Sequence, residues 1–275
     1  MGRSSQNKEK RRRWLIAEVL CGLLLVLLLL LIARQVFQRA QISAEERSAA
    51  GLVQTSTAAP SPPPEEGGLE TAHPTAEPPS RQDLIQTLRQ QNQNTVGILE
   101  FDADRVMYVC QGEDNRYYMT HTFDHSENPA GMIYMDYRNS LEPRSDNLIL
   151  YGHNMNDGSR FGTLKRFTQS EYLLANPVFR FSDPYETVEY LPFAIFYTTV
   201  LTDDPAYFEF DRTDFVDDVD FNAYVQEVRA RSVLNLPVEV TSGDRLLTLA
   251  TCSDAHDRGR LVIVCREKHD KDSAG

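Results

Sequence analysis

The longest apolar stretch of the 275-residue chain lies near its start. Residues 14–33, WLIAEVLCGLLLVLLLLLIA, hold one charge, Glu18, close to the first end. A helix of this length and composition can cross a bilayer. The alternative is a cleaved signal peptide, but its apolar core would be shorter, and the following RQVFQRAQISA has only a weak small-residue cleavage pattern. The pattern favours an uncleaved transmembrane anchor.

The next segment has almost no periodic apolar signal. Residues 34–80 are rich in Ala, Ser, Thr, Pro and Glu, with runs such as APSPPPEE, which predicts a spacer that is semi-extended where prolines cluster. At residues 81–94, Leu84, Ile85 and Leu88 recur at helical spacing, which predicts a short amphipathic helix. We therefore place the folded domain at residues 81–270.

Within this domain the apolar segments are short and rich in β-branched and aromatic residues. They are GILEF, RVMYVC, GMIYM, NLILYG, VFRFS, ETVEYLPFAIFYTTV, RLLTLAT and RLVIVC. Short apolar segments separated by Gly, Asn, Asp and Pro predict a mainly β domain, either a barrel or a sandwich. One clear helix interrupts them, because Phe221, Tyr224, Val225 and Val228 share a helical face. A shorter helix is predicted across residues 161–176.

The distribution of charge predicts a membrane topology and argues against one class of partner. Residues 1–13 hold six Lys or Arg and one Glu, a net +5, so the overall −12 leaves −17 for the remainder. A basic cluster before the span predicts a cytoplasmic N-terminus, with everything after residue 33 outside the cell membrane. The acidic remainder argues against nucleic acid as a partner. The acidic clusters lack the ligand order of a calcium loop, so we expect no metal and no other cofactor.

Four cysteines, at positions 21, 110, 252 and 265, have no metal-knuckle or CxxC spacing. Cys21, Cys110 and Cys265 lie inside apolar runs and are interpreted as packing residues. Cys252 lies where the strand RLLTLAT meets the polar SDAHDRG, so its thiol can stand at a sheet edge, as a nucleophile requires. A buried thiol at a strand end is the alternative.

A cysteine nucleophile needs a base, and four histidines are candidates. His153 follows the strand NLILYG and would face Cys252 if the two strands were neighbours, whereas His121, His125 and His256 are the competitors. The residue types alone leave this choice open.

The candidate oxyanion donor is Arg260, which opens the last apolar strand eight residues after the cysteine. If the loop folds back, its guanidinium lies beside the sulfur. The competitor is Arg258, which falls in the loop before Gly259.

Two motifs together resemble the sortase family. TLATC, followed by an Arg that opens a terminal apolar strand, is similar to the sortase Cys/Arg signature, and NLILYGHNM is similar to the strand and turn that carry the sortase histidine. AGMIYMDYRN, QGEDNRYYMTH and the helix near DFNAYVQEVRARSV resemble class B members in particular. The resemblance covers residues 95–268. Because the joint order is more specific than any single motif, it selects Cys252, His153 and Arg260.

The resemblance implies a fold, a reaction and partners. The fold is an eight-stranded β-barrel with a long helix before the cysteine strand. The reaction is that of a cysteine transpeptidase, in which Cys252 attacks a threonine carbonyl in the C-terminal sorting signal of a surface protein. Arg260 stabilises the oxyanion, and His153 protonates the leaving amine. An amine of the peptidoglycan precursor then resolves the thioacyl enzyme, which attaches the protein to the cell wall.

The resemblance also implies substrate-binding residues. In class B sortases an Asn before an aromatic pair and the residues just before the cysteine line the substrate groove, and the nearest matches are Asn115, Ala250 and Thr251. Ala250 departs from the serine often found there, so no hydrogen bond is expected from that side chain. The aromatic stretch 207–210 fits either a groove lip or a core strand.

Three other functions remain alternatives at this point. A pilus-polymerising sortase and a cysteine protease that uses water as acceptor would share the same catalytic residues. A barrel that only binds would require a missing catalytic residue, and all three are present.

Overall fold

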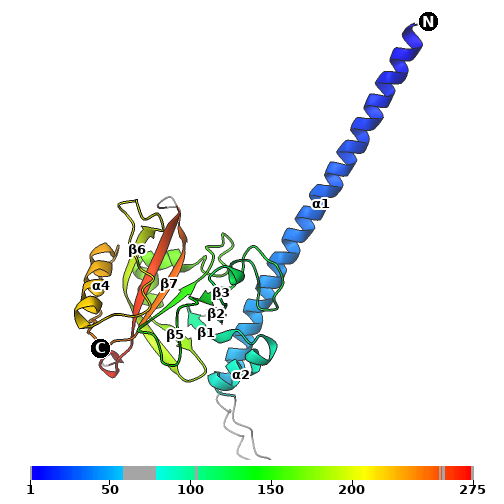
Figure 1. Cartoon of the computed structure of the whole chain (residues 1–275). Helices are drawn as coiled ribbons and strands as arrows, with labels where there is room; N and C mark the ends of the chain where they lie inside the picture. The colour runs from blue at the N-terminus through cyan, green and yellow to red at the C-terminus, as the bar shows by residue number, and fades with distance from the viewer. Residues whose placement is uncertain (1, 58–78, 103–104, 254, 256–257, 274–275) are drawn as a thin grey trace, which may run out of the picture. The chain divides into compact units, whose positions relative to one another are not determined.

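The computed structural model describes residues 2–57, 79–102, 105–253, 255 and 258–273 (Figure 1). The chain forms two compact units, residues 1–44 and 45–275.

The first unit consists of the greater part of helix α1 (Gly2–Thr57). Large apolar side chains between Trp14 and Ile32 are exposed along it. By length and composition the helix is able to cross a membrane. The predicted span at residues 14–33 therefore lies in a helix, as expected.

The helix continues where we expected a spacer. Residues 34–57 are helical rather than semi-extended, because this stretch contains no proline and is rich in Ala, Gln, Arg and Glu, which favour a helix. From Glu45 onward α1 belongs to the second unit, where Ala49 and Val53 are buried beside Leu84. The prolines of the predicted spacer before Pro79 lie outside the described residues.

The second unit is built on a closed β-barrel (Figure 1). Its strands are β1 (Thr95–Phe101), β2 (Arg105–Gln111), β3 (Ile133–Met135), β4 (Asn147–Tyr151), β5 (Phe179–Ser182), β6 (Thr187–Thr199), β7 (Leu246–Ser253) and β8 (Gly259–Glu267). Each falls on one of the predicted apolar segments, and the eight-stranded barrel is confirmed. The order around the barrel is β1-β2-β3-β4-β7-β8-β6-β5.

Two strand pairs, β2–β3 and β4–β7, are parallel, and the others are antiparallel. A parallel pair needs a long crossover. The crossover from β4 to β7 carries β5, β6 and three helices: η2 (Leu164–Thr168), α3 (Ser170–Ala175) and α4 (Asp218–Arg231). This crossover allows two strands almost a hundred residues apart to lie side by side.

The predicted helices form with their predicted faces. In α2 (Arg81–Gln91), Leu84, Ile85 and Leu88 are buried, and Ser80 and Asp83 form a capping box at its start. Helix α4 buries Phe221, Tyr224, Val225 and Val228 and packs against β6. Two further short helices are η1 (Tyr117–Met119) and η3 (Asp270–Ser273). The barrel interior holds the largest apolar cluster, which includes Leu99, Leu150, Leu249 and Ile263.

Candidate active site

Strand register places Cys252 next to Arg260. Strands β7 and β8 pair antiparallel, with Cys252 opposite Arg260 and Ser253 opposite Gly259. Directly opposite residues in such a pair have Cβ atoms about 4.5–5.5 Å apart. The first six residues of β7 are buried, whereas Cys252 is exposed. The thiol therefore stands at the end of the strand, with Arg260 directly opposite on the neighbouring strand, and the loop folds back as the sequence predicted.

The parallel pairing of β4 with β7 brings His153 to the same end of the barrel. Tyr151 lies opposite Ala250, and the Gly152 N–H donates to the Ala250 carbonyl over 3.3 Å. The Thr251 hydroxyl donates to the Gly152 carbonyl over 2.7 Å, and the Asn154 amide donates to the Cys252 carbonyl over 3.1 Å. The two strands are neighbours, which was the condition for His153 to face the cysteine.

His153 is half-buried, and hydrogen bonds shift the pKa of its imidazole. A hydrogen bond with the Cys252 side chain raises the pKa of His153; burial lowers this pKa, and the Met119 carbonyl raises it, with a net upward shift. The distance from Nε2 to the Met119 oxygen is 2.8 Å. Because a carbonyl can only accept, Nε2 must carry a proton. The neutral tautomer with its proton on Nε2 also satisfies this bond, and it is the upward pKa shift that favours the imidazolium, the form that can donate a proton.

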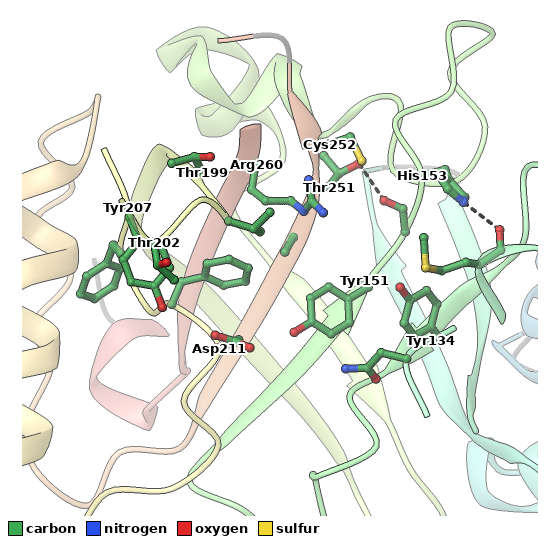
Figure 2. Close-up of a pocket in the computed structure, with 17 residues that line it drawn as sticks. Tyr134, Tyr151, His153, Thr199, Thr202, Tyr207, Asp211, Thr251, Cys252 and Arg260 are labelled. Atoms are coloured by element: carbon green, nitrogen blue, oxygen red, sulfur yellow. Dashed lines mark hydrogen bonds between the residues drawn. The ribbon is translucent and has the colours of Figure 1, made fainter. Parts of the chain in front are cut away.

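Arg260 is held in place by its own strand end. Its Nη1 donates to the carbonyls of Gly259 over 3.0 Å and of Arg258 over 3.3 Å. Figure 2 shows Cys252 between Arg260 and His153. The competitor Arg258 is exposed, has a φ of 47° and does not line the pocket.

The three residues open onto a pocket of about 360 Å³. Tyr134 and Tyr151 line it below Cys252 in the view of Figure 2. Another wall comes from the end of β6, with Thr199, and from the chain that follows it, with Tyr207 and Asp211. Residues 207–210 are not in a strand. Tyr207 and Phe210 line the pocket, and the Phe210 side chain is also buried. The stretch thus combines the predicted groove lip with core packing.

Asn115, Ala250 and Thr251 also line this pocket. The Asn115 amide donates to Asp136 Oδ2 over 3.0 Å, and its carbonyl accepts from the Tyr137 N–H over 3.0 Å. The Thr251 hydroxyl is bonded to Gly152. These polar groups therefore shape the wall, and their contact with substrate stays a prediction.

Sequence reasoning missed a buried acid beneath the pocket. Asp136 is fully buried and accepts from Tyr151 over 2.9 Å, from Asn115, and from Arg138. Burial alone would raise the pKa of Asp136, but these hydrogen bonds bring it below its usual value. Arg138 also pairs with Asp211 over 2.7 Å. The only sequence signal was that Asp136 falls inside AGMIYMDYRN, without a chemical role attached.

The other candidates lie elsewhere. His121 stacks on Tyr117, with ring centroids 4.1 Å apart, and His125 Nδ1 lies 3.1 Å from the Tyr117 hydroxyl. His256 lies outside the described residues.

The remaining cysteines differ from Cys252 in their surroundings. Cys110 and Cys265 are buried, and burial raises the pKa of Cys110 to about 12 and that of Cys265 well above its usual value. Both thiols therefore stay protonated and pack, as predicted. Cys21 is exposed on α1.

Comparison with known proteins identifies a family. Residues 105–268 match the sortase domain. Sortase B of Listeria monocytogenes is 36% identical over 184 residues, covering 66% of this chain and 72% of the relative. Sortase B of Staphylococcus aureus is 32% identical over 185 residues, covering 66% and 73%. The structure of a Staphylococcus aureus sortase B–substrate complex superposes with a TM-score of 0.62 and 30% identity, covering 69% of this chain and 86% of that one.

Proposed function

This chain belongs to the sortase family as a class B member, and we propose that it cleaves a C-terminal sorting signal after threonine and joins the surface protein to an amine of the cell wall precursor. As a sortase it is a cysteine transpeptidase. The observation that carries the proposal is that Cys252, His153 and Arg260 line one pocket. A solved sortase B with substrate bound has the same fold.

The first half-reaction transfers the acyl group to the enzyme. The Cys252 thiolate attacks the threonine carbonyl carbon, and the electron pair moves to the carbonyl oxygen, where Arg260 donates hydrogen bonds. The oxyanion then collapses, the C–N bond breaks, and the His153 imidazolium gives its proton to the departing amine. Because Nε2 is bonded to the Met119 carbonyl, Nδ1 is the nitrogen that exchanges this proton.

The second half-reaction reverses the proton transfer. The acceptor amine attacks the thioacyl carbon, loses a proton to His153, and expels the Cys252 thiolate, so an amide replaces the thioester. The exposed position of Cys252 leaves room for an amine acceptor to approach. Asn115, Ala250 and Thr251 are proposed to contact the sorting signal in the pocket that they line.

We place the enzyme in the cell membrane through α1. The apolar part of this helix is able to cross a bilayer, and six basic residues precede it. The positive-inside rule then puts the N-terminus in the cytoplasm and the catalytic domain outside the cell, where surface proteins and cell wall precursors meet it.

Mass spectrometry of the full chain in detergent micelles tests the reaction. The enzyme is mixed with a library of sorting peptides, with and without an amine acceptor, and its cysteine-containing peptides are analysed. We expect a thioacyl adduct on Cys252 and, with amine, an amide product in preference to free acid. Free acid alone at saturating amine would make it a protease, and an adduct on another cysteine would move the nucleophile.

A further inference from the structure

A buried arginine, Arg160, lies in the turn that follows His153, and the C-terminal part of α1 holds it in place. Arg160 is 1% exposed, and its Nη1 donates to Glu45 Oε1 over 2.7 Å while Nη2 lies 3.4 Å from Oε2. A guanidinium that meets both oxygens of a carboxylate is fixed in direction as well as position. Glu45 compensates a charge that would be costly to leave buried alone.

The neighbouring glutamate holds the backbone of the same residue. Glu46 Oε1 accepts from the Arg160 N–H over 2.9 Å, and its Oε2 lies 3.7 Å from Arg105 Nη1. Arg160 has a φ of 52°, a conformation that is unfavourable for a residue with a side chain. The two carboxylates thus meet Arg160 at both its side chain and its backbone, and together they support a conformation that it would not adopt by itself.

Arg160 closes the turn that carries His153. It forms an antiparallel bridge with Asn154, and the next residue, Phe161, donates its N–H to the His153 carbonyl over 3.0 Å. Asn154 in turn donates to the Cys252 carbonyl. A chain of contacts therefore runs from the glutamates, through Arg160 and its bridge partner, to the backbone of both His153 and Cys252.

We propose that Glu45 and Glu46 are positioning residues of this sortase, which hold the turn of His153 in register with Cys252 by clamping Arg160. Neither glutamate lines the pocket, so neither contacts substrate, and both act through the histidine. The inference rests on the proposed function, since His153 must serve as the proton donor for its placement to affect the rate. A misplacement of a catalytic group by about 1 Å can lower the rate by as much as about 10²-fold.

The test uses the full chain in detergent micelles and measures single-turnover thioacylation of Cys252 at several peptide concentrations. Glu46→Ala removes the acceptor for the Arg160 N–H, whereas Glu46→Gln keeps an oxygen at that position. Glu45→Gln leaves the Arg160 charge uncompensated. We expect the acylation rate to fall about tenfold in Glu46→Ala and Glu45→Gln, and to stay within about threefold of wild type in Glu46→Gln. The KM for peptide should not change in any variant.

Glu100→Gln is the matched control. Glu100 pairs with Arg81 over 3.1 Å, and the side chains are 15% and 11% exposed, close to the 12% of Glu45. This pair ties α2 to β1, outside the turn of His153. Its loss should lower the thermal midpoint without slowing acylation. Equal slowing in Glu100→Gln, or normal rates in both Glu46→Ala and Glu45→Gln, would overturn the clamp and leave only a structural role.

A second readout separates this inference from the proposed substrate chemistry. Alkylation of Cys252 by iodoacetamide, followed by mass spectrometry of its peptide at one fixed pH, needs no sorting peptide. The same two variants should be alkylated several-fold more slowly than wild type, because the imidazole would no longer be held against the thiol. If no peptide acylates the wild type but alkylation still follows this order, the substrate assignment fails and the clamp stands. Equal alkylation of all variants contradicts the clamp.

Discussion

Cys252 and the buried cysteines have the same functional group but opposite surroundings. Desolvation keeps Cys110 and Cys265 protonated, whereas Cys252 is exposed at a strand end and hydrogen-bonded to His153. A thiol becomes a nucleophile when a base or cation favours its thiolate and substrate can approach. The environment, rather than the residue type, therefore separates one reactive cysteine from two packing ones.

Cys252→Ala should abolish transpeptidation and also lower the pKa of His153. The hydrogen bond with Cys252 is the largest cause of the upward shift, so without it the imidazole returns toward its usual pKa. A raised histidine pKa stabilises the fold fully below the usual value near 6.5, and this contribution is lost as pH rises through the folded pKa. NMR titration of the ring protons measures the shift, with His153→Gln to assign the signal. An unchanged pKa in Cys252→Ala would contradict the contact.

Arg260→Lys should reduce kcat by roughly 10²–10³, the loss expected for one oxyanion donor, with little change in the thermal midpoint. The lysine keeps the charge but loses the planar fork, which donates to the strand-end carbonyls and which we propose also donates to the substrate oxygen. Steady-state kinetics on one sorting peptide and one amine acceptor measure the effect.

Arg258→Lys is the control for this substitution. Arg258 is exposed and outside the pocket, so its replacement should be nearly silent. If Arg258→Lys were the impaired variant and Arg260→Lys the silent one, the oxyanion donor would be Arg258.

The residues identified from sequence were those that belong to a linear motif. Cys252, His153 and Arg260 each follow or open an apolar strand. The order of these motifs along the chain was enough to identify the three residues as one site. The Met119 carbonyl could not be found this way, because a backbone oxygen has no sequence signature. Asp136 was missed for a related reason, since an acid becomes notable only when folding buries it among three donors.

Among the elements, strong periodicity made α2 and α4 predictable, and short apolar segments made all eight strands predictable. The error was the part of α1 after residue 33, where the sequence has high helix propensity but weak periodicity. Composition suggested a spacer, yet helix formers without proline continued the helix to Thr57. The parallel pairing of β4 with β7 was also beyond local patterns, because it depends on closing the barrel.

The short C-terminal helix η3 supports a buried charge on β8. Arg266 is fully buried, and its guanidinium donates to both oxygens of Asp272, whose pKa these hydrogen bonds hold at about 2. Asp272→Asn should lower the free energy of unfolding at pH 7 by about 1–3 kcal/mol, because it removes the charge that compensates a desolvated guanidinium. Denaturant titration in detergent measures this loss.

The stability that Asp272 contributes should also depend on pH, and the direction follows from its lowered pKa. A depressed carboxylate pKa stabilises the fold above the unfolded value near 3.9, and the contribution is lost as pH falls toward 2. The difference between wild type and Asp272→Asn should therefore shrink between pH 4 and pH 2. Asp270→Asn, an exposed position in the same helix, should have little effect at any pH. A constant difference across this range would argue against the charge of Asp272 as the cause.

Taken as a whole, the molecule separates a basic N-terminal end from an acidic remainder, with the apolar part of α1 between them. We expect protease added to intact cells to cut in the proline-rich segment and release a catalytic fragment, with residues 1–13 protected. Immunoblotting with antibodies against each end follows the two products. Protection of the catalytic domain with loss of the N-terminal epitope would reverse the orientation.

The closed barrel also limits the ways in which a sorting peptide can bind. Many peptide-binding domains add the ligand as an extra strand to an open sheet edge, where main-chain pairing supplies affinity regardless of sequence. In this barrel each described strand already has a partner on both sides. The described strands therefore offer no open edge for such pairing, and we expect recognition of the sorting signal in the pocket at the end of the barrel instead. We therefore expect inhibitors to owe their selectivity to groups that fit this pocket.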